Sequence, residues 1–547
     1  MKLNKGIIRD ISSSFKDKKP FEITLIITFF TQMLFITWFN LTTIKSHTGF
    51  DSSWTYLRSV LMWEEGTLKN PTWSEQNNFF LDIPGTPATL FYGLTKDIFL
   101  SFGITNIIIL VLILWVLYKI VDTMKLDVKS KFFALNLVVC PYLTNGFDNH
   151  LDLGYFSNVL GCAGHASVRV LIALMIIYQF QLIHEKNEFS IGTYVTFLLC
   201  VLTGTSAGVF MIIMMIFPLL MYELEMVFLK NNWYVLKTKE SIFAYICTAC
   251  IFIGKVGMNF FYPGESLDGS RTWTTLDSLW KNMGAVILGF MKLLGVLPVT
   301  KDEEISIMSP EGITRLFPIV IFIVFIISMV VIIRKCIKEP KGNAGIIMYL
   351  ANIIVCNFVT FSLFNVQYGQ YVFEDRYLIT TFFAAVVILA YYINSLDKKQ
   401  IFSLVLSLGL LIAIIGNNII SDINYYVVEN VYYRRAVAID EYLDAQNDSD
   451  LVYIWGNDLV SIARIIRVYD TDRIYKFVKD NGGYYHWGDY TTYEVNADYT
   501  GVTYLIIDPA FDKATPEVLD HYQLVQEYEG LLLYRCDTNP VDFSNLK

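Results

Sequence analysis

The sequence predicts a polytopic α-helical membrane protein with about 11 transmembrane helices and a small C-terminal α/β domain. Of its 547 residues, 54% are hydrophobic and only 17% are charged, against roughly 25% charged residues in soluble domains. Several apolar runs reach about the 20 residues that a bilayer crossing requires, and basic residues gather in alternate connections between these runs. The net charge of −9 gives no support to a nucleic-acid partner.

The first apolar run follows a basic leader, residues 1–22, which carries Lys2, Lys5, Arg9, Lys16, Lys18 and Lys19. Positive residues on one flank predict that this flank stays in the cytoplasm. The run, residues 23–41, ends without the small residues of a signal-peptidase site. We therefore expect a retained first helix and a cytoplasmic N-terminus.

The transmembrane domain is expected over residues 23–420, with outer loops at 42–97, 145–166, 262–313 and 367–375. Lysine and arginine clusters fall in the other connections, as the positive-inside rule requires. The number of crossings is odd, so residues 421–547 are expected outside the cytoplasm. The expected helices are 23–41, 98–121, 132–144, 167–183, two short spans within 191–222, 241–261, 314–334, 345–366, 376–394 and 401–420.

Two apolar stretches leave alternatives open. Residues 191–222 contain a run of small residues at 203–208 and form either two spans or one kinked helix; two spans place Lys230, Lys237 and Lys239 in the cytoplasm. Residues 283–298 carry Lys292 in the middle, and a lysine at mid-bilayer costs several kcal/mol. We expect that second stretch to be re-entrant or interfacial.

The tail has a different pattern. Residues 430–446 predict an amphipathic helix, and β-rich runs follow at 451–455, 465–468, 503–507 and 531–534. Neither a Gly-rich dinucleotide fingerprint nor a P-loop is present. Cys247 and Cys250 form a C-x-x-C inside an apolar span without a second pair, so they are interpreted as ordinary core cysteines.

The candidate site begins at Asp51, which opens the stretch 49–66 just beyond the first helix and leads into an amphipathic helical pattern. An acid there lies where a lipid-borne substrate presents its polar head. The second outer loop carries Asp148, His150 and Asp152, and Glu374 and Arg376 precede the helix expected at 376–394. Loops on a rigid scaffold are where sites concentrate, and all these loops are expected on one face.

Each residue type suits a part in group transfer. A carboxylate such as Asp51 can take a proton from an acceptor or orient it, and arginine can bind a leaving phosphate. The arginine candidates are Arg376 and, more weakly, Arg58, Arg169 and Arg271, with His165 as a further substrate contact. Asp148, His150 and Asp152 could hold a divalent ion, Mg or Mn, although this spacing is permissive.

Each candidate also has a structural interpretation. Asp51 fits a helix N-cap before Ser-Ser-Trp, and Asp148, His150 and Asp152 fit a solvated loop. His165 lies among small residues, which is typical of a structural histidine. Arg376 could pair only with Glu374 or Asp375.

The layout resembles the GT-C superfamily of membrane glycosyltransferases. The segment Gly49-Phe50-Asp51-Ser52-Ser53-Trp54 is similar to the family's first-loop segment, and Glu374-Asp375-Arg376-Tyr377-Leu378 is similar to the Arg-Tyr motif of many bacterial members. Two positions depart from the family. Ser52 follows Asp51 where mannosyltransferases show Asp-Glu, and His486-Trp487-Gly488-Asp489-Tyr490 matches the oligosaccharyltransferase Trp-Trp-Asp-Tyr-Gly motif only loosely.

The resemblance implies transfer of a sugar from a polyprenyl-phosphate donor to a glycan, lipid or protein acceptor at the outer face of the plasma membrane, with Asp51 as base or acceptor-orienting acid. A transporter or flippase of lipid-linked glycans is the alternative, and a non-catalytic scaffold is a third. A transporter should carry ionisable groups at mid-membrane in discontinuous helices. Here nearly all of them lie in the outer loops, with Lys255 and Lys292 as exceptions.

Overall fold

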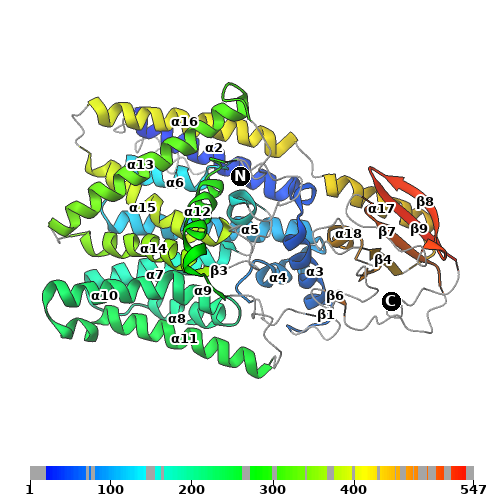
Figure 1. Cartoon of the computed structure of the whole chain (residues 1–547), viewed down its shortest axis with the longest axis horizontal. Coiled ribbons are helices and arrows are strands. Elements are labelled where there is room, and N and C mark those ends of the chain that lie inside the picture. The colour runs from blue at the N-terminus through cyan, green and yellow to red at the C-terminus, as the bar shows by residue number, and fades with distance from the viewer. Residues whose placement is uncertain are drawn as a thin grey trace, which may run out of the picture.

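A computed structural model describes most of the chain, and Figure 1 shows a bundle of long helices with a small sheet at one end. The described residues are 20–68, 73–74, 81–142, 154–161, 166–261, 272–297, 305–338, 342–365, 375–396, 401–427, 431–449, 451–455, 463–471, 473–478, 489–490, 501–509 and 519–537.

Eleven helical segments of the described chain form the bundle, in agreement with the predicted number of crossings. Nine are long and apolar enough to cross a membrane, which makes the chain an integral, multi-pass membrane protein. The two shorter ones are α6 and α8. The eleven are α2 (Pro20–Thr42), α5 (Ile98–Thr123), α6 (Val128–Val139), α7 (Ala166–Lys186), α8 (Ile191–Gly204), α9 to α10 (Gly208–Met211 and Phe217–Lys230, joined by the π-helical Ile212–Ile216), α11 (Lys239–Phe261), α13 (Pro310–Lys338), α14 (Ala344–Leu363), α15 (Ile379–Ser395) and α16 (Ile401–Val427).

Helix α6 is displaced along the chain from its predicted range of 132–144. It begins at Val128 because the Asp127 carboxylate accepts a hydrogen bond from Ser130 N at 2.8 Å, which caps the helix. It ends at Val139, two residues before Pro141. The predicted range missed the cap because apolar periodicity starts only after the lysines of the first turn.

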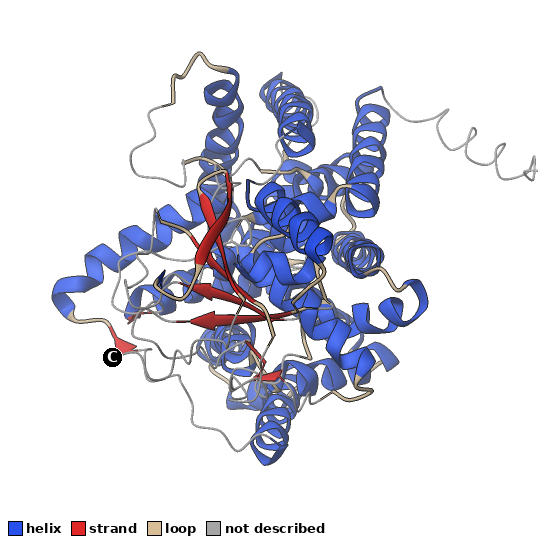
Figure 2. Cartoon of the chain, turned by 90° about the vertical axis from the view of Figure 1, so that its right-hand side faces the viewer, coloured by secondary structure: helices blue, strands red, loops and turns tan. Residues whose placement is uncertain are grey.

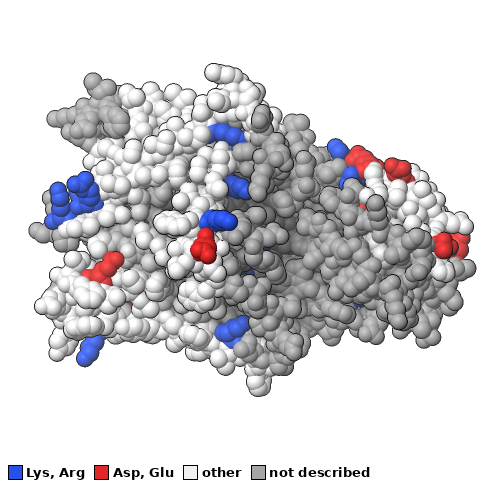
Figure 3. Space-filling model, in the orientation of Figure 1, with Lys and Arg blue, Asp and Glu red and all other residues white. Residues whose placement is uncertain are grey.

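Hydrogen bonds between the predicted inner connections show that these turns lie at one end of the bundle. Asn343 Nδ2 donates to Met124 O at 2.9 Å, and Asp127 N donates to the Asn394 side chain at 2.9 Å. Lys239 Nζ donates to Asn187 O at 2.6 Å, which joins two further turns. We call this the basic end, because Lys125, Lys186, Lys239 and Lys335 lie in or beside its turns; one group of Lys and Arg side chains is visible at the left of Figure 3.

The small-residue break at 203–208 separates two helices, as the two-span alternative predicts. Helix α8 ends at Gly204 and α9 starts at Gly208. Here α8 crosses α11 closely, because an added Cβ at Gly204 would lie 2.2 Å from Ile251 O and one at Gly254 would lie 2.1 Å from Val201 O. Small residues are therefore required by packing at this crossing.

The stretch with Lys292 forms α12 (Leu276–Leu293) and is not among the candidate spans of the described chain. It runs crosswise to the long helices in Figure 1. Lys292 lies half-buried in its last turn, and Leu276 and Trp280 are largely exposed. The expectation of a segment that does not span fits this placement.

The opposite end of the bundle, called here the capped end, carries α3 (Phe50–Glu64), α4 (Gly85–Thr95) and the C-terminal sheet. The view onto this end shows the strands in front of the helix ends (Figure 2). The sheet has the order β5-β4-β7-β9-β8. Strand β4 is parallel to β5 and β7, and β9 is antiparallel to β7 and β8. Its strands are β4 (Leu451–Trp455), β5 (Ile474–Val478), β7 (Thr503–Ile507), β8 (Gln523–Tyr528) and β9 (Leu531–Cys536).

The tail predictions are confirmed in part. The expected helix appears as α17 (Val431–Gln446), and β4, β7 and β9 coincide with expected strands. The expected strand at 465–468 is wrong, because Ala463–Tyr469 forms the helix α18. Its run Ile465-Ile466-Arg467-Val468 is buried throughout, and a short run of this kind has no periodicity that separates strand from helix.

Candidate active site

Helix α3 starts one turn beyond the first transmembrane helix, and its N-cap is Gly49 rather than Asp51. Gly49 N donates to Ser52 Oγ at 2.8 Å, and Ser53 N donates to Gly49 O at 3.0 Å. Asp51 is therefore the second residue of the helix, and the interpretation of Asp51 as the N-cap is wrong. An acid in the first turn still lies at the positive end of the helix dipole.

The first part of α3 is buried on every side. Every residue from 52 to 60 is buried, including Arg58 and three serines. The predicted amphipathic pattern is therefore wrong in one respect, because no face of this segment is left to solvent. A helix that is buried all round is enclosed by other parts of the protein, here by α4 and by the C-terminal domain.

Helix α4 lies against α3 through two glycines. Ser59 Oγ donates to Gly85 O at 2.9 Å, and a Cβ on Gly85 would lie 2.7 Å from Thr55 Cγ2. A Cβ on Gly93 would lie 2.3 Å from the Trp63 ring. The two helices can approach this closely only because both positions lack side chains.

The C-terminal domain also packs onto α3, through α18. Val468 belongs to one buried apolar cluster with Ile44, Tyr56 and Val60 of the first loop. Tyr469 stacks on Phe99 with ring centroids 5.1 Å apart, and its hydroxyl donates to Lys45 O. A two-residue antiparallel pairing of β1 (Trp73–Ser74) with β6 (Asp489–Tyr490) adds a backbone connection. The tail therefore fixes the helix that begins beside Asp51.

Asp82, which no sequence pattern singled out, anchors the first loop to the bundle. Its side chain is fully buried and its two oxygens accept from three side chains. Arg169 Nε donates to Oδ2 at 3.0 Å and Arg169 Nη2 to Oδ1 at 3.4 Å. Thr203 Oγ1 donates to Oδ2 at 2.9 Å, and Ser206 Oγ donates to Oδ1. The partners are 87 to 124 residues away along the chain, so no local spacing reveals them.

Arg376, a predicted phosphate ligand, is half-buried in the 3-10 turn Asp375–Leu378. Its guanidinium lies over the Tyr377 ring, 5.7 Å from the centroid. Tyr377 stacks on Phe210 with centroids 5.2 Å apart and the planes within 8°. Phe210 of α9 lies four residues after Ser206, so Arg376 and the Asp82–Arg169 pair flank the short segment that runs from the α8–α9 break into α9.

The remaining predicted residues are placed only in part. Arg58 is fully buried within α3, and the structure brings Arg169 to Asp82. Glu374, His165, Arg271 and the predicted metal ligands Asp148, His150 and Asp152 lie outside the described residues, as does any account of the Asp51 side chain. Within the described ranges, no three His, Cys, Asp or Glu side chains are grouped so that they could hold a metal ion.

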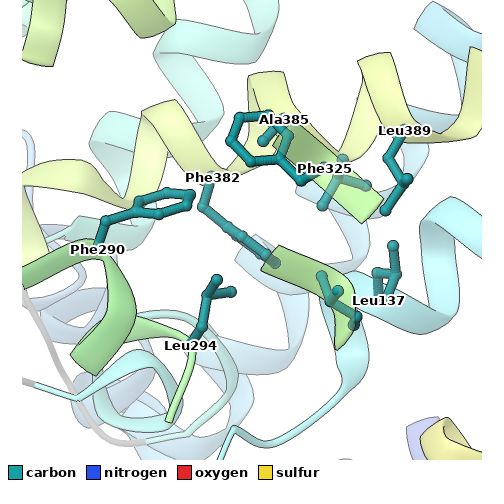
Figure 4. A pocket seen from close by; sticks show the side chains of 9 residues that line it. Leu137, Phe290, Leu294, Phe325, Phe382, Ala385 and Leu389 are labelled. Carbon is teal, nitrogen blue, oxygen red and sulfur yellow. The ribbon is translucent and has the colours of Figure 1, made fainter. Parts of the chain in front are cut away.

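An apolar hollow lies between α6, α12, α13 and α15, lined by Leu137, Phe290, Leu294, Phe325, Phe382 and Leu389 among others (Figure 4). Its cavity volume is about 10 Å³, which is about the space that one water molecule needs. No polar side chain lines it. The hollow lies at the C-terminal end of α12, and it is too small to hold a substrate.

Comparison with known proteins gives a fold but no sequence family. No protein-family model matches the chain, and no curated protein matches it. The structure is similar to that of ArnT from Cupriavidus metallidurans bound to undecaprenyl phosphate, with a TM-score of 0.55 and 9% identity over 93% of this chain and 97% of that chain. The apo form of the same ArnT matches with a TM-score of 0.53 and 10% identity over the same shares.

A third structure is the Archaeoglobus fulgidus oligosaccharyltransferase in complex with Zn and sulfate, with a TM-score of 0.45 and 11% identity over 83% of this chain and 62% of that chain. The two ArnT likenesses cover 93% of this chain and 97% of the ArnT chain. The chain therefore shares the overall fold of ArnT.

Proposed function

We propose that the protein is a membrane glycosyltransferase that moves a sugar from a polyprenyl-phosphate donor to an acceptor at the outer face of the membrane. The observation that carries the proposal is the likeness, over 93% of the chain, to an ArnT structure that holds undecaprenyl phosphate. In this proposal the sugar is linked to the lipid carrier through a phosphate, and the acceptor is a glycan, lipid or protein.

The distribution of basic residues supports a cytoplasmic basic end and an outward-facing capped end. Lys125, Lys186, Lys239 and Lys335 lie in or beside turns of the basic end, and such residues are retained in the cytoplasm. The capped end then faces outward, and with it Asp51, Arg376 and the C-terminal domain.

The proposed chemistry uses two groups of this end. Asp51 accepts the proton of the acceptor nucleophile as that atom attacks the anomeric carbon, and the bond from this carbon to the phosphate oxygen breaks. Arg376 donates hydrogen bonds to the phosphate, which leaves with the electron pair of the broken bond. A divalent ion held by Asp148, His150 and Asp152 remains a proposal from the sequence, and no step here requires it.

The test is a transfer assay on the purified full chain in lipid nanodiscs. Labelled polyprenyl-phosphate sugars are offered with mixed cell-envelope acceptors, and the label is followed into product. The proposal predicts a labelled product together with free polyprenyl phosphate. Lipid-linked sugar that crosses the bilayer of proteoliposomes without any product would favour a transporter, and a folded protein that does neither would refute both.

A further inference from the structure

The Asp82–Arg169 pair offers an anion-binding edge that the function above does not use. The carboxylate is saturated, because each oxygen accepts two hydrogen bonds from the set formed by Arg169, Thr203 and Ser206. A buried carboxylate with a complete set of donors has little reason to rearrange. Asp82 therefore acts as a fixed support.

Arg169 approaches this support with one edge of its guanidinium. Nε and Nη2 face the carboxylate, and Nη2 also lies 3.4 Å from Ser206 Oγ. A planar guanidinium that uses these two atoms presents Nη1 on the edge away from its partner. Within the described part of the chain no residue accepts a hydrogen bond from Nη1, and the side chain is 25% exposed.

The Nη1 edge of Arg169 lies in the same part of the capped end as Arg376, the proposed phosphate ligand. Ser206 lies in the turn between α8 and α9, and Phe210 lies four residues later, within α9. Ser206 contacts Arg169, and Phe210 stacks on the tyrosine beneath Arg376. Two guanidinium groups thus lie at either end of one short segment of the capped end, and an anion with several acceptor oxygens is the ligand that such a pair recognises.

We propose that Asp82 is a positioning residue that holds Arg169 as the second phosphate ligand for the lipid-linked donor. This inference rests on the proposed function for the identity of the anion. Burial of the carboxylate fixes the direction of the Nη1 edge, so no conformational freedom of Arg169 is lost when the phosphate arrives. The same contacts fasten the first loop, and with it α3, to the α8–α9 break.

The test compares Asp82→Asn with Asp97→Asn in the full chain in nanodiscs. Asp97 lies in the same loop, where its exposed side chain caps α5 by accepting from Leu100 N at 3.0 Å, and asparagine serves equally well as an N-cap. Binding is measured for undecaprenyl phosphate and for undecaprenol, which has the same tail without the phosphate.

We expect Asp82→Asn to weaken undecaprenyl phosphate binding about tenfold, the usual size for a charged hydrogen bond that is lost or misaligned, and to leave undecaprenol binding unchanged. Asp97→Asn should change neither affinity. Asp82→Asn should add little to Arg169→Ala, because Asp82 acts through that arginine. If Asp82→Asn does not fold, Ser206→Ala removes one donor to the carboxylate and should weaken phosphate binding about threefold.

Equal loss of both lipids in Asp82→Asn would show a purely structural role and overturn the inference. The inference is also overturned if Asp82→Asn prefers undecaprenyl phosphate over undecaprenol as strongly as wild type does. Where Ser206→Ala is used instead, an unchanged preference in that variant has the same consequence. A wild-type chain that does not distinguish the two lipids would instead refute the proposed function, so the two failures are separable.

Discussion

The close contact of α4 with α3 gives a prediction whose size follows from the structure. An alanine at Gly85 would place its Cβ 2.7 Å from Thr55 Cγ2, 3.0 Å from Ser59 Oγ and 3.3 Å from Thr55 O. Carbon atoms in contact lie about 3.5–4.0 Å apart, so α4 must move away from α3 by about 1 Å. Such overpacking costs about 1–3 kcal/mol of folding free energy.

The same movement should reach the reaction, because α3 carries Asp51 in its first turn. A displacement of about 1 Å in a reacting group lowers a rate by about a hundredfold. We therefore expect Gly85→Ala to lower both the thermal unfolding midpoint in detergent and the turnover in the sugar-transfer assay. Undecaprenyl phosphate binding should change less, since its ligands lie on other elements.

Two controls separate this contact from a general effect of replacing glycine. Gly257 of α11 has nothing within 4 Å of an added Cβ, so Gly257→Ala should keep turnover and gain slight stability. Thr55→Ser removes the Cγ2 that clashes and should partly restore turnover in the Gly85→Ala background. The reasoning is refuted if Gly85→Ala behaves like Gly257→Ala.

Two further predictions concern the C-terminal domain. Val468→Ala should destabilise the contact of α18 with α3 by about 1–2 kcal/mol and lower turnover. Leu524→Ala, on the exposed outer strand β8, should change neither. Equal effects of the two variants in the transfer assay would contradict the role given to α18. Burial, with Asp470 and Asp444 nearby, raises the pKa of Asp440 to about 6 from 3.8, although Arg473 opposes the shift. The stability that this pKa contributes is present below about pH 4 and lost as the pH rises through about 6. Asp440→Asn should therefore raise the unfolding midpoint at pH 7.5 by the equivalent of about 1 kcal/mol after solvent screening and by less at pH 5, and thermal melts that show no pH-dependent difference would contradict this.

The transmembrane fold could be predicted from the sequence because its signal is local. Each long apolar run became a helix near its expected bounds, and the basic clusters fell into turns that hydrogen bonds bring together at one end. The two-span interpretation of 191–222 was decided by lysines alone, and the structure confirms it. Length and charge are properties of single segments, so no knowledge of packing was needed.

The site could be predicted only where one segment carried the signal. Asp51 stands out as an acid beyond the first helix, but its position relative to the cap depends on a hydroxyl contact of Ser52. Asp82 had no signal because its partners come from α7, from α8 and from the break between α8 and α9, all far away along the chain. The burial of α3 was missed for the same reason, since α18 covers it from more than 400 residues away.

The most direct measurement of the central claim is the single-turnover rate of sugar transfer by Asp51→Asn, with the labelled lipid donor already bound. The account predicts a rate about 10²–10⁴-fold below wild type, the usual contribution of a general base, with undecaprenyl phosphate binding and the unfolding midpoint unchanged. A rate within a few-fold of wild type, in a variant that binds donor normally, would contradict the role of Asp51.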